Sequence, residues 1–298
     1  MRTFDLDDLE IFRSVVHEGG VTRAASRLHR VPSNITTRVK QCEERLGVRL
    51  FRRQGRALSL TDEGRVLLGH AERLLRMAEL AEQEIKSGVV RGMLRLGSLE
   101  STAGVRLPPV LSAFHVRHPD VTVELRTGTT DALLRLLERF EVEAAFVSEP
   151  FERGTLSALP VFEEKLVLVT AKGSPVPRRA SDLSRTTLVA FPHGCSYRRR
   201  LVEWLAEAGA SPQRFLDLAS YHAIVACVAA GTGVAIAPAD VLKHAVLATE
   251  LQCHPLPARF RVNRTHLVWP GEASAPLRAF VELLPKMRRQ ARTMKQRI

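Results

Sequence analysis

A short stretch near the N-terminus, residues 32–46, combines polar and basic side chains in a pattern suited to contact with DNA. Its apolar residues have the spacing of one helix face: Ile35, Val39, Cys42 and Leu46. Its other positions include short polar or basic residues and no acid in the N-terminal half: Ser33, Asn34, Thr36, Thr37, Arg38 and Lys40. Ser, Thr and Asn bond to phosphates and to base edges, and Arg and Lys add positive charge. We therefore interpret these six residues as candidate DNA contacts.

A second group of basic residues follows between Val48 and Thr61. Arg52, Arg53 and Arg56 surround Gly55, and a hairpin with this glycine at its tip would hold the three arginines near the phosphate backbone. Residues 23–56 carry ten basic residues and two acids, or +8, within a net charge of +12 for the chain. A small helical bundle with an ordinary charged surface explains this window equally well when it is considered alone.

The elements that would position these residues can be predicted from their neighbours. An amphipathic helix begins at Leu6 and ends before Gly19 and Gly20, and a shorter helix covers 21–28. A break at His29–Arg30 precedes the third helix, where Pro32 suits the first turn. Three short helices with a tight break before the third are typical of a helix-turn-helix, in which the third helix presents its N-terminal residues to the major groove.

A fourth helix is predicted after Thr61, and it carries an apolar seam. The seam residues, at alternating steps of 4 and 3, are Leu67, Ala71, Leu74, Ala78, Ala81 and Ile85. This spacing is typical of a coiled coil, and so of pairing with a second copy. An amphipathic helix packed on its own domain has the same pattern, so both interpretations stay open.

From Arg91 onward, short apolar runs alternate with helical segments. The predicted strands cover 93–97, 121–125, 144–147, 166–170, 187–191, 234–238 and 264–269, and the predicted helices cover 107–117, 131–140, 199–208, 222–230 and 277–287. This alternation predicts βαβ units and a mostly parallel sheet. Residues 92–285 have a net charge of only +2, so the basic excess lies elsewhere.

Candidate ligand contacts follow from where such sheets bind small molecules, at the carboxyl ends of strands and the starts of helices. The residues at these positions are Ser101, Thr102, Thr129, Ser148, Cys195, Tyr197, Arg198 and His222. They suit a small carboxylate or an amino-acid-like ligand, to which Arg198 would add a charge-assisted contact. Each hydroxyl can also be a simple N-cap, and Cys195 is either a reactive thiol or a small lining residue. Glu100 would disfavour an anion or bind an ammonium group.

Composition excludes several classes of protein. The 298 residues, 45% of them hydrophobic, suit two domains with sizeable cores, and no apolar run is long enough to span a membrane. Acids near the N-terminus argue against a signal peptide, and therefore against a secreted solute-binding protein. Four Cys without a CxxC pair and ten scattered His support neither disulfides nor a metal site. Because no catalytic or cofactor motif occurs, we expect a cytosolic protein without cofactors that is not an enzyme.

Four stretches, taken in order, resemble the winged helix-turn-helix of LysR-type transcriptional regulators: LDDLEIFRSVVHEGG, TRAASRLH, EERLGVRLFRR and LSLTDEG. One departure occurs where many members have Ser/Thr-Gln-Pro-Ala, because this chain has Val31-Pro32-Ser33-Asn34. The resemblance therefore implies the recognition helix but not its individual base contacts. It extends over nearly the whole chain and implies an α+β protein: a winged helix-turn-helix, a long linker helix and a two-lobed α/β effector domain similar to periplasmic binding proteins.

The resemblance also implies domain limits and partners. We expect a DNA-binding domain over 1–61, a linker and dimerisation helix over 62–91, and an effector-binding domain over 92–298. With crossings near Phe162–Glu164 and Val268-Trp269, lobe one comprises 92–162 and 270–298, and lobe two comprises 163–269. Such regulators bind promoter DNA as dimers and tetramers, respond to a small effector near the position of Ser101, and have RNA polymerase as a further partner. The tail 286–298, with a charge of +6, either contacts DNA or another subunit or is a solvated surface.

Overall fold

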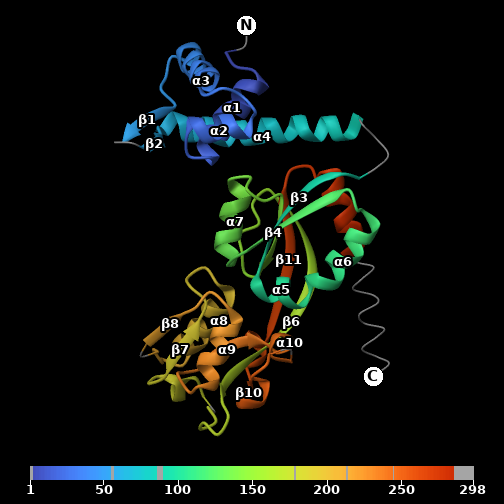
Figure 1. Ribbon diagram of the computed structural model, residues 1–298. Coiled ribbons are helices and arrows are strands. Elements are labelled where there is room, and N and C mark those ends of the chain that lie inside the picture. Colours follow the sequence, from blue (N-terminus) through green and yellow to red (C-terminus); the bar gives the residue numbers. More distant parts are fainter. Residues whose placement is uncertain are drawn as a thin grey trace. The chain divides into compact units, whose positions relative to one another are not determined.

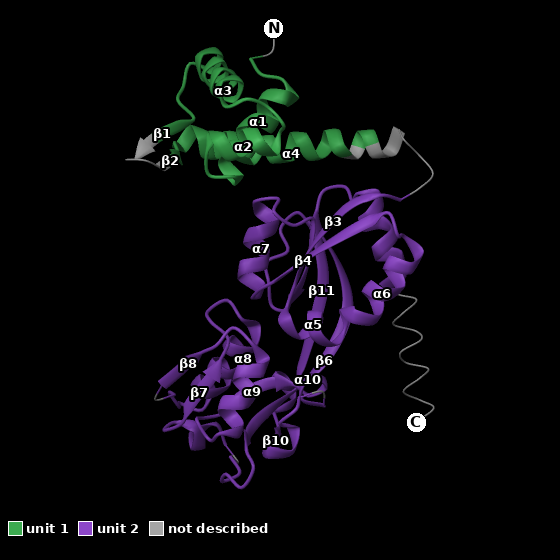
Figure 2. Ribbon diagram, in the orientation of Figure 1, with its two compact units in different colours: residues 1–88 green, residues 89–298 purple. Residues whose placement is uncertain are grey.

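The computed structural model describes residues 3–54, 57–85, 90–177, 179–212, 214–243 and 245–284 (Figure 1). Contacts divide the chain into two compact units, residues 1–88 and 89–298 (Figure 2). The basic tail and the predicted wing tip at Gly55 and Arg56 lie outside the described residues. Within the described ranges, no helix is long and apolar enough to cross a membrane.

The first unit contains the predicted helix-turn-helix and hairpin. Its elements are α1 (Leu6–His17), α2 (Val21–Arg27), α3 (Pro32–Leu46), β1 (Phe51–Gln54), β2 (Ala57–Leu60) and α4 (Asp62–Ile85), with β1 and β2 antiparallel. Asp5 and Asp8 form a capping box that starts α1, and Gly47 takes the left-handed conformation that ends α3. The three helices, the hairpin and the fourth helix that the sequence predicts are therefore confirmed.

The core of the first unit joins α1, α3, α4 and the hairpin. Its buried residues are Leu9, Phe12, Cys42, Leu50, Leu67, Ala71 and Leu75. The ring centroids of Phe12 and Phe51 lie 5.3 Å apart, which ties α1 to β1. A second cluster, which includes Ile11, Ala24 and Ile35, packs α2 and α3 against α1.

The apolar seam predicted on α4 is only partly correct. Leu67 and Ala71 are buried, but the next buried apolar residue is Leu75, whereas Leu74 is 40% exposed. The helix therefore packs on its own unit, and its packed face contains only the first two residues of the predicted seam. Leu74 lies instead with Val66 and Met77 on an adjoining exposed stripe.

Gly64 allows α4 to begin close against the hairpin. A Cβ at this position would lie 2.2 Å from the carbonyl oxygen of Leu50 and 2.9 Å from Cδ2 of Leu60. Because the Leu50 backbone cannot yield easily, we expect Gly64→Ala to destabilise the first unit by about 2–3 kcal/mol. Gly69→Ala is the control, since a Cβ there meets nothing within 4 Å and alanine favours the helix. Thermal unfolding of both variants tests this, and equal melting temperatures would contradict it.

The second unit is built on a seven-stranded sheet in the order β10-β6-β11-β5-β3-β4, with β9 also paired to β6. The strands are β3 (Gly92–Ser98), β4 (Val121–Thr127), β5 (Ala144–Ser148), β6 (Leu156–Ala171), β9 (Ala235–Pro238), β10 (Leu251–Pro255) and β11 (Val262–Pro270). Strand β3 is parallel to β4 and β5, but the pairs that contain β6 or β11 are antiparallel. The prediction of a mostly parallel sheet is wrong, because two long strands pass through both lobes in opposite directions.

Helices cover the strands of each lobe. In lobe one, four helices accompany β3, β4 and β5: α5 (Glu100–Val105), α6 (Leu107–Arg117), α7 (Thr130–Glu138) and a helix over 275–284. Lobe two contains the parallel pair β7 (Thr187–Ala190) and β8 (Arg214–Asp217). Its helices are η1 (Ala180–Leu183), α8 (Ser196–Glu207), α9 (Tyr221–Ala229), α10 (Ala239–Lys243), η2 (Ala248–Glu250) and α11 (Ala258–Arg261). Each lobe has its own apolar core, around Phe114, Phe146 and Phe280 in lobe one and around Leu188 and Leu201 in lobe two. The elements that were not predicted are α5, η1, β8, α10, η2, β10 and α11.

The two strands that connect the lobes cross side by side. Residues Phe162–Glu164, the predicted first crossing, pair with Asn263–Thr265 of β11. The predicted second crossing at Val268-Trp269 is wrong, because Val268 pairs with Ala145 of β5, inside lobe one. The register places this crossing near Asn263–Thr265 instead. The error arises because the crossing lies in the interior of a strand, where the sequence pattern has no break.

Candidate functional site

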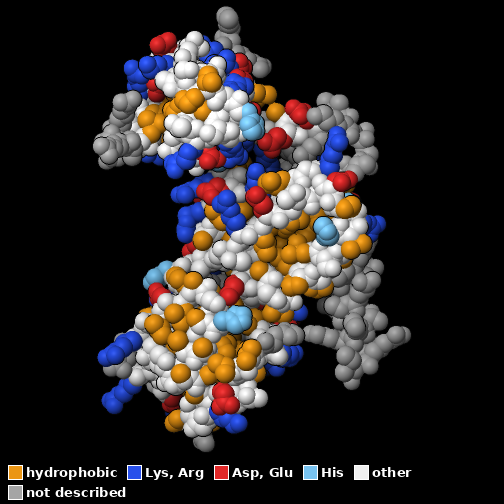
Figure 3. All heavy atoms as spheres, viewed as in Figure 1, with side chains coloured by type: hydrophobic (Ala, Val, Ile, Leu, Met, Phe, Trp, Pro, Cys, Tyr) orange, Lys and Arg blue, Asp and Glu red, His pale blue; other side chains and the backbone are white. Residues whose placement is uncertain are grey.

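The N-terminal half of α3 presents an exposed surface without acids. Ser33, Asn34, Thr36, Thr37 and Lys40 are all exposed, as predicted for DNA contacts. No acid occurs in the first turn of α3, so no side chain there neutralises the positive end of the helix dipole. Lys and Arg side chains, blue in Figure 3, occur on the part of the first unit that carries α3. This surface can therefore receive phosphates or base edges.

Arg38 differs from its neighbours because acids at the start of α1 bind it. Its Nη2 atom lies 3.1 Å from Oδ1 of Asp5, 3.1 Å from Oδ2 of Asp7 and 2.9 Å from Oδ1 of Asp8. Arg45 donates to Oδ2 of Asp8 at 2.6 Å, and the Asp8 side chain is fully buried. These ion pairs fix α3 on α1. We infer that Arg38 positions the recognition helix, whereas the prediction made it a DNA contact.

Glu43, one of the two acids within residues 23–56, holds the hairpin onto α3. The backbone N–H groups of Leu50 and Phe51 donate to its Oε1 atom at 2.7 and 3.1 Å, and Arg49 donates to Oε2 at 2.9 Å. Glu43 is buried, so these bonds satisfy a carboxylate that would otherwise be costly to desolvate. An acid eight residues before a basic hairpin is too weak a signal to identify such a contact from sequence.

The wing, defined as the hairpin β1–β2, presents Arg52 to solvent. Arg52 is exposed, and its Nε atom lies 3.3 Å from the Ser59 hydroxyl across the hairpin. Arg56 and the side chain of Arg53 lie outside the described residues, so their predicted roles stay predictions. Arg52 can therefore reach a phosphate beside the surface of α3.

In the second unit, five polar side chains from both lobes form one buried chain of hydrogen bonds. The Tyr197 hydroxyl lies 3.1 Å from the Ser101 hydroxyl and donates to Oε2 of Glu164 at 2.6 Å. Asn263 donates to the same Glu164 oxygen at 3.1 Å, and the Ser148 hydroxyl donates to Oδ1 of Asn263. Three of these residues, Ser101, Ser148 and Tyr197, were predicted as ligand contacts. The crossing strands supply the other two, which the prediction missed.

Ionisation in this cluster follows from burial. Burial raises the pKa of the Glu164 carboxyl, and hydrogen bonds from Tyr197 and Asn263 partly oppose this rise. Burial and the negative charge of Glu164 keep the pKa of Tyr197 well above its usual value. The phenol is therefore protonated and acts as the hydrogen-bond donor to Glu164.

Glu100 occupies the start of α9, where a ligand anion was one expectation. The backbone N–H of Tyr221 donates to both of its carboxylate oxygens, at 3.1 and 2.8 Å. Burial raises the pKa of Glu100, and the Tyr221 N–H opposes this shift. A further contact between the lobes joins Arg106 to Asp240 at 2.5 Å. Side chains of lobe one therefore bind lobe two directly, through Glu100 and Arg106.

The other five predicted ligand residues, Thr102, Thr129, Cys195, Arg198 and His222, lie outside this buried chain of hydrogen bonds. Arg198 is bound within lobe two by Asp217, by the Phe191 carbonyl at 3.1 Å and by the face of Phe215, 4.2 Å away. Burial raises the pKa of Cys195, so the structure favours a lining residue over a reactive thiol. Thr129 caps α7, Thr102 is buried and His222 is exposed at the start of α9. The structure thus brings Ser101, Ser148 and Tyr197 together and gives Arg198 other partners.

Comparison with known proteins covers both units. Residues 6–65 match the family described as "Bacterial regulatory helix-turn-helix protein, lysR family", and residues 87–288 match the "LysR substrate binding domain". The chain belongs to the LysR family of transcriptional regulators. Relatives include the HTH-type transcriptional regulator CzcR of Bacillus subtilis, 34% identical over 86% of this chain and 87% of that protein. YofA of Bacillus velezensis is 35% identical over 93% of this chain and 95% of its own length.

Solved structures of LysR-type regulators share the fold. Full-length OxyR from Pseudomonas aeruginosa superposes with a TM-score of 0.74 at 21% identity, covering 95% of this chain and 94% of OxyR. CbnR in complex with its target DNA gives a TM-score of 0.65 at 24% identity, covering 95% of this chain and 99% of CbnR. The expected α+β architecture is therefore confirmed. The family matches and the curated relatives show that the chain is a regulator rather than an enzyme.

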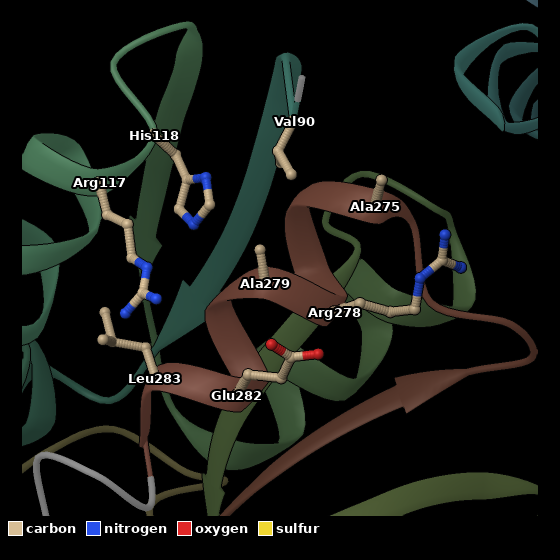
Figure 4. Close-up of a pocket in the computed structure, with 8 residues that line it drawn as sticks. All are labelled: Val90, Arg117, His118, Ala275, Arg278, Ala279, Glu282 and Leu283. Atoms are coloured by element: carbon tan, nitrogen blue, oxygen red, sulfur yellow. The ribbon is translucent and has the colours of Figure 1, made fainter. Parts of the chain in front are cut away.

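Three pockets formed by described residues of this LysR-type regulator lie outside the buried chain of hydrogen bonds. One, of about 330 Å³, lies between the end of α6 and the helix over 275–284 (Figure 4). Its lining residues are Val90, Arg117, His118, Ala275, Arg278, Ala279, Glu282 and Leu283. A groove of about 800 Å³ runs along α7 and the segment 150–156, and a third pocket adjoins His266. None of the eight predicted ligand residues lines these three pockets. Among the described residues, no group of three or more His, Cys, Asp or Glu could hold a metal.

Proposed function

We propose that this LysR-type regulator binds promoter DNA through the N-terminal half of α3 and the wing, and that a small molecule bound between the two lobes changes how it does so. The observation that carries the proposal is the exposed, acid-free surface of α3 beside Arg52. In a dimer, two copies of α3 would enter successive major grooves, and wing arginines would fix the register on phosphates.

The exposed stripe of α4 supports self-association. Val66 and Met77 are each more than 60% exposed, and Leu74 lies beside them on the same helix. Burying such large apolar side chains against a second copy of α4 would stabilise a dimer. We propose a dimer through this stripe, a tetramer through further contacts, and RNA polymerase as a partner of the bound form. We place the protein in the cytoplasm, with the promoter DNA.

Footprinting on the DNA upstream of the regulator's own gene tests the proposal. We expect a defined segment to be protected, with a pattern that changes when an effector is added. Uniform protection of all DNA, with no response to any compound tested, would contradict the proposal. Thermal-shift screening finds candidate effectors, because a ligand that binds only the folded state stabilises it.

Arg52→Ala should weaken binding to every DNA sequence by a similar factor. If Arg52 contacts a phosphate, the slope of log K against log salt should become less steep by about 1. Arg259→Ala, which removes an exposed arginine from α11 in the second unit, is the charge-matched control and should leave the slope unchanged. An equal slope for the wild type and Arg52→Ala would refute the phosphate contact.

A further inference from the structure

The ligand position between the lobes is filled by a side chain of the protein itself. Ser101, on α5 of lobe one, has the Tyr197 hydroxyl from α8 of lobe two at 3.1 Å. Tyr197 is 4% exposed and Ser101 is 2% exposed, so both residues are closed off from solvent. A molecule that binds Ser101 must therefore displace the Tyr197 phenol.

The directions of the hydrogen bonds define what could replace this phenol. The single phenolic proton goes to Glu164, at 2.6 Å, a length typical of a bond to an ionised acceptor. The phenolic oxygen is then free to accept the proton of Ser101. A replacement must donate to Glu164 and accept from Ser101 at one atom, and a neutral hydroxyl group does both.

A carboxylate does not match this position. It would have no proton for Glu164 and would place a second negative charge beside a buried acid. Arg106 pairs with Asp240, and Nη2 of Arg200 donates to the Glu149 carbonyl and to Oδ1 of Asn263. The Nε atoms of both arginines are buried without a partner among the described residues, so the charge of Glu164 at the position of the phenol, rather than a lack of cations, disfavours a carboxylate there. Arg198, the expected carboxylate partner, pairs with Asp217.

One other buried hydroxyl lies near this subsite. The Tyr221 hydroxyl, at the start of α9, is buried without a hydrogen-bond partner among the described residues. Burial raises the pKa of Tyr221, and the charges of Tyr197 and Glu164 add to this shift, as they do only from nearby. Buried hydroxyls normally have partners, so a hydroxyl-bearing ligand would satisfy a group that the protein leaves unpaired.

We propose that the subsite formed by Ser101 and Glu164 takes a neutral hydroxyl group and excludes carboxylates, and that Tyr197 fills it until such an effector displaces the phenol. This rests on the proposed function, because it assumes that the effector binds between the lobes. It replaces the small carboxylate expected from sequence with an uncharged alcohol or phenol.

Tyr197→Ala in the full-length chain tests the subsite, because it leaves a space the size of phenol. At neutral pH, we expect this variant to bind phenol at least about tenfold more tightly than benzene or benzoate, by calorimetry and thermal shift. The wild type should show no phenol binding at this position. Adding Glu164→Gln to the variant should strengthen benzoate binding about tenfold, since the repelling charge is gone.

Phe260→Ala is the matched control, because Phe260 lies in the apolar core of lobe two. Its cavity should bind benzene at least as well as phenol. Equal affinities of the Tyr197→Ala variant for phenol, benzene and benzoate would overturn the proposal. So would a preference for benzoate.

Tyr197→Phe carries the test if Tyr197→Ala does not fold. Loss of the paired hydroxyl should lower the melting temperature by about 2–4 °C, whereas Tyr221→Phe removes an unpaired hydroxyl and should not lower it. Equal losses would overturn the proposal. Selective phenol binding without any ligand effect on DNA binding would leave the subsite intact and would instead refute effector control.

Discussion

Asp8→Ala should lower the free energy of unfolding of the first unit by about 3 kcal/mol. The Asp8 carboxylate is fully buried and binds Arg38 at 2.9 Å and Arg45 at 2.6 Å. It also accepts the Asp5 N–H at 3.2 Å in the capping box of α1. One substitution therefore removes half of the capping box and the two ion pairs of Asp8 that hold α3 on α1, so DNA binding should fall as well.

The control for Asp8→Ala is Asp62→Ala. Asp62 also pairs with an arginine, Arg65, but its side chain is 88% exposed, so its loss should cost less than about 0.5 kcal/mol. Native-state hydrogen exchange of the α1 and α3 amides measures the change in the first unit without unfolding the second. Equal effects of the two substitutions would show that burial of Asp8 does not matter.

Thr37→Glu should weaken specific DNA binding roughly 100-fold, or about 2.7 kcal/mol. Thr37 is exposed on the acid-free half of α3, so a glutamate there would be tolerated by the fold. In the complex, its charge would lie beside phosphates, and like charges brought together at an interface cost several kcal/mol. Gel shifts with the protected promoter segment measure the loss.

Thr249→Glu is the control for net charge. Thr249 is exposed in lobe two, so the same charge change there should alter DNA affinity less than about twofold. A similar loss for both variants would mean that total charge, rather than the surface of α3, determines binding. An unchanged affinity for Thr37→Glu would place the DNA contact elsewhere.

Local patterns predicted the first unit well because its helices obey them individually. The spacing of Ile35, Val39 and Cys42 and the stop at Gly47 determine α3 before any tertiary contact forms. The same reasoning failed on α4, where Leu74 and Leu75 both fit an apolar face. Packing against Leu9 and Phe12 of α1, rather than periodicity, selects Leu75.

The second unit was predicted less completely, because its decisive contacts join distant parts of the chain. Ser101 and Tyr197 are 96 positions apart, and Glu164 and Asn263 are 99 apart. No local pattern indicates that a tyrosine in lobe two would fill the position expected for a ligand. Family resemblance identified Ser101 as a candidate, but only the fold reveals that its partner is a phenol.

The most direct test of the account compares the affinity of the full-length protein for the protected promoter segment with its affinity for a shuffled duplex of the same length. At about 0.15 M salt we predict a preference of at least about 10³-fold for the promoter segment, with both affinities falling steeply as salt increases. Equal affinity for the two duplexes would contradict sequence-specific recognition by α3.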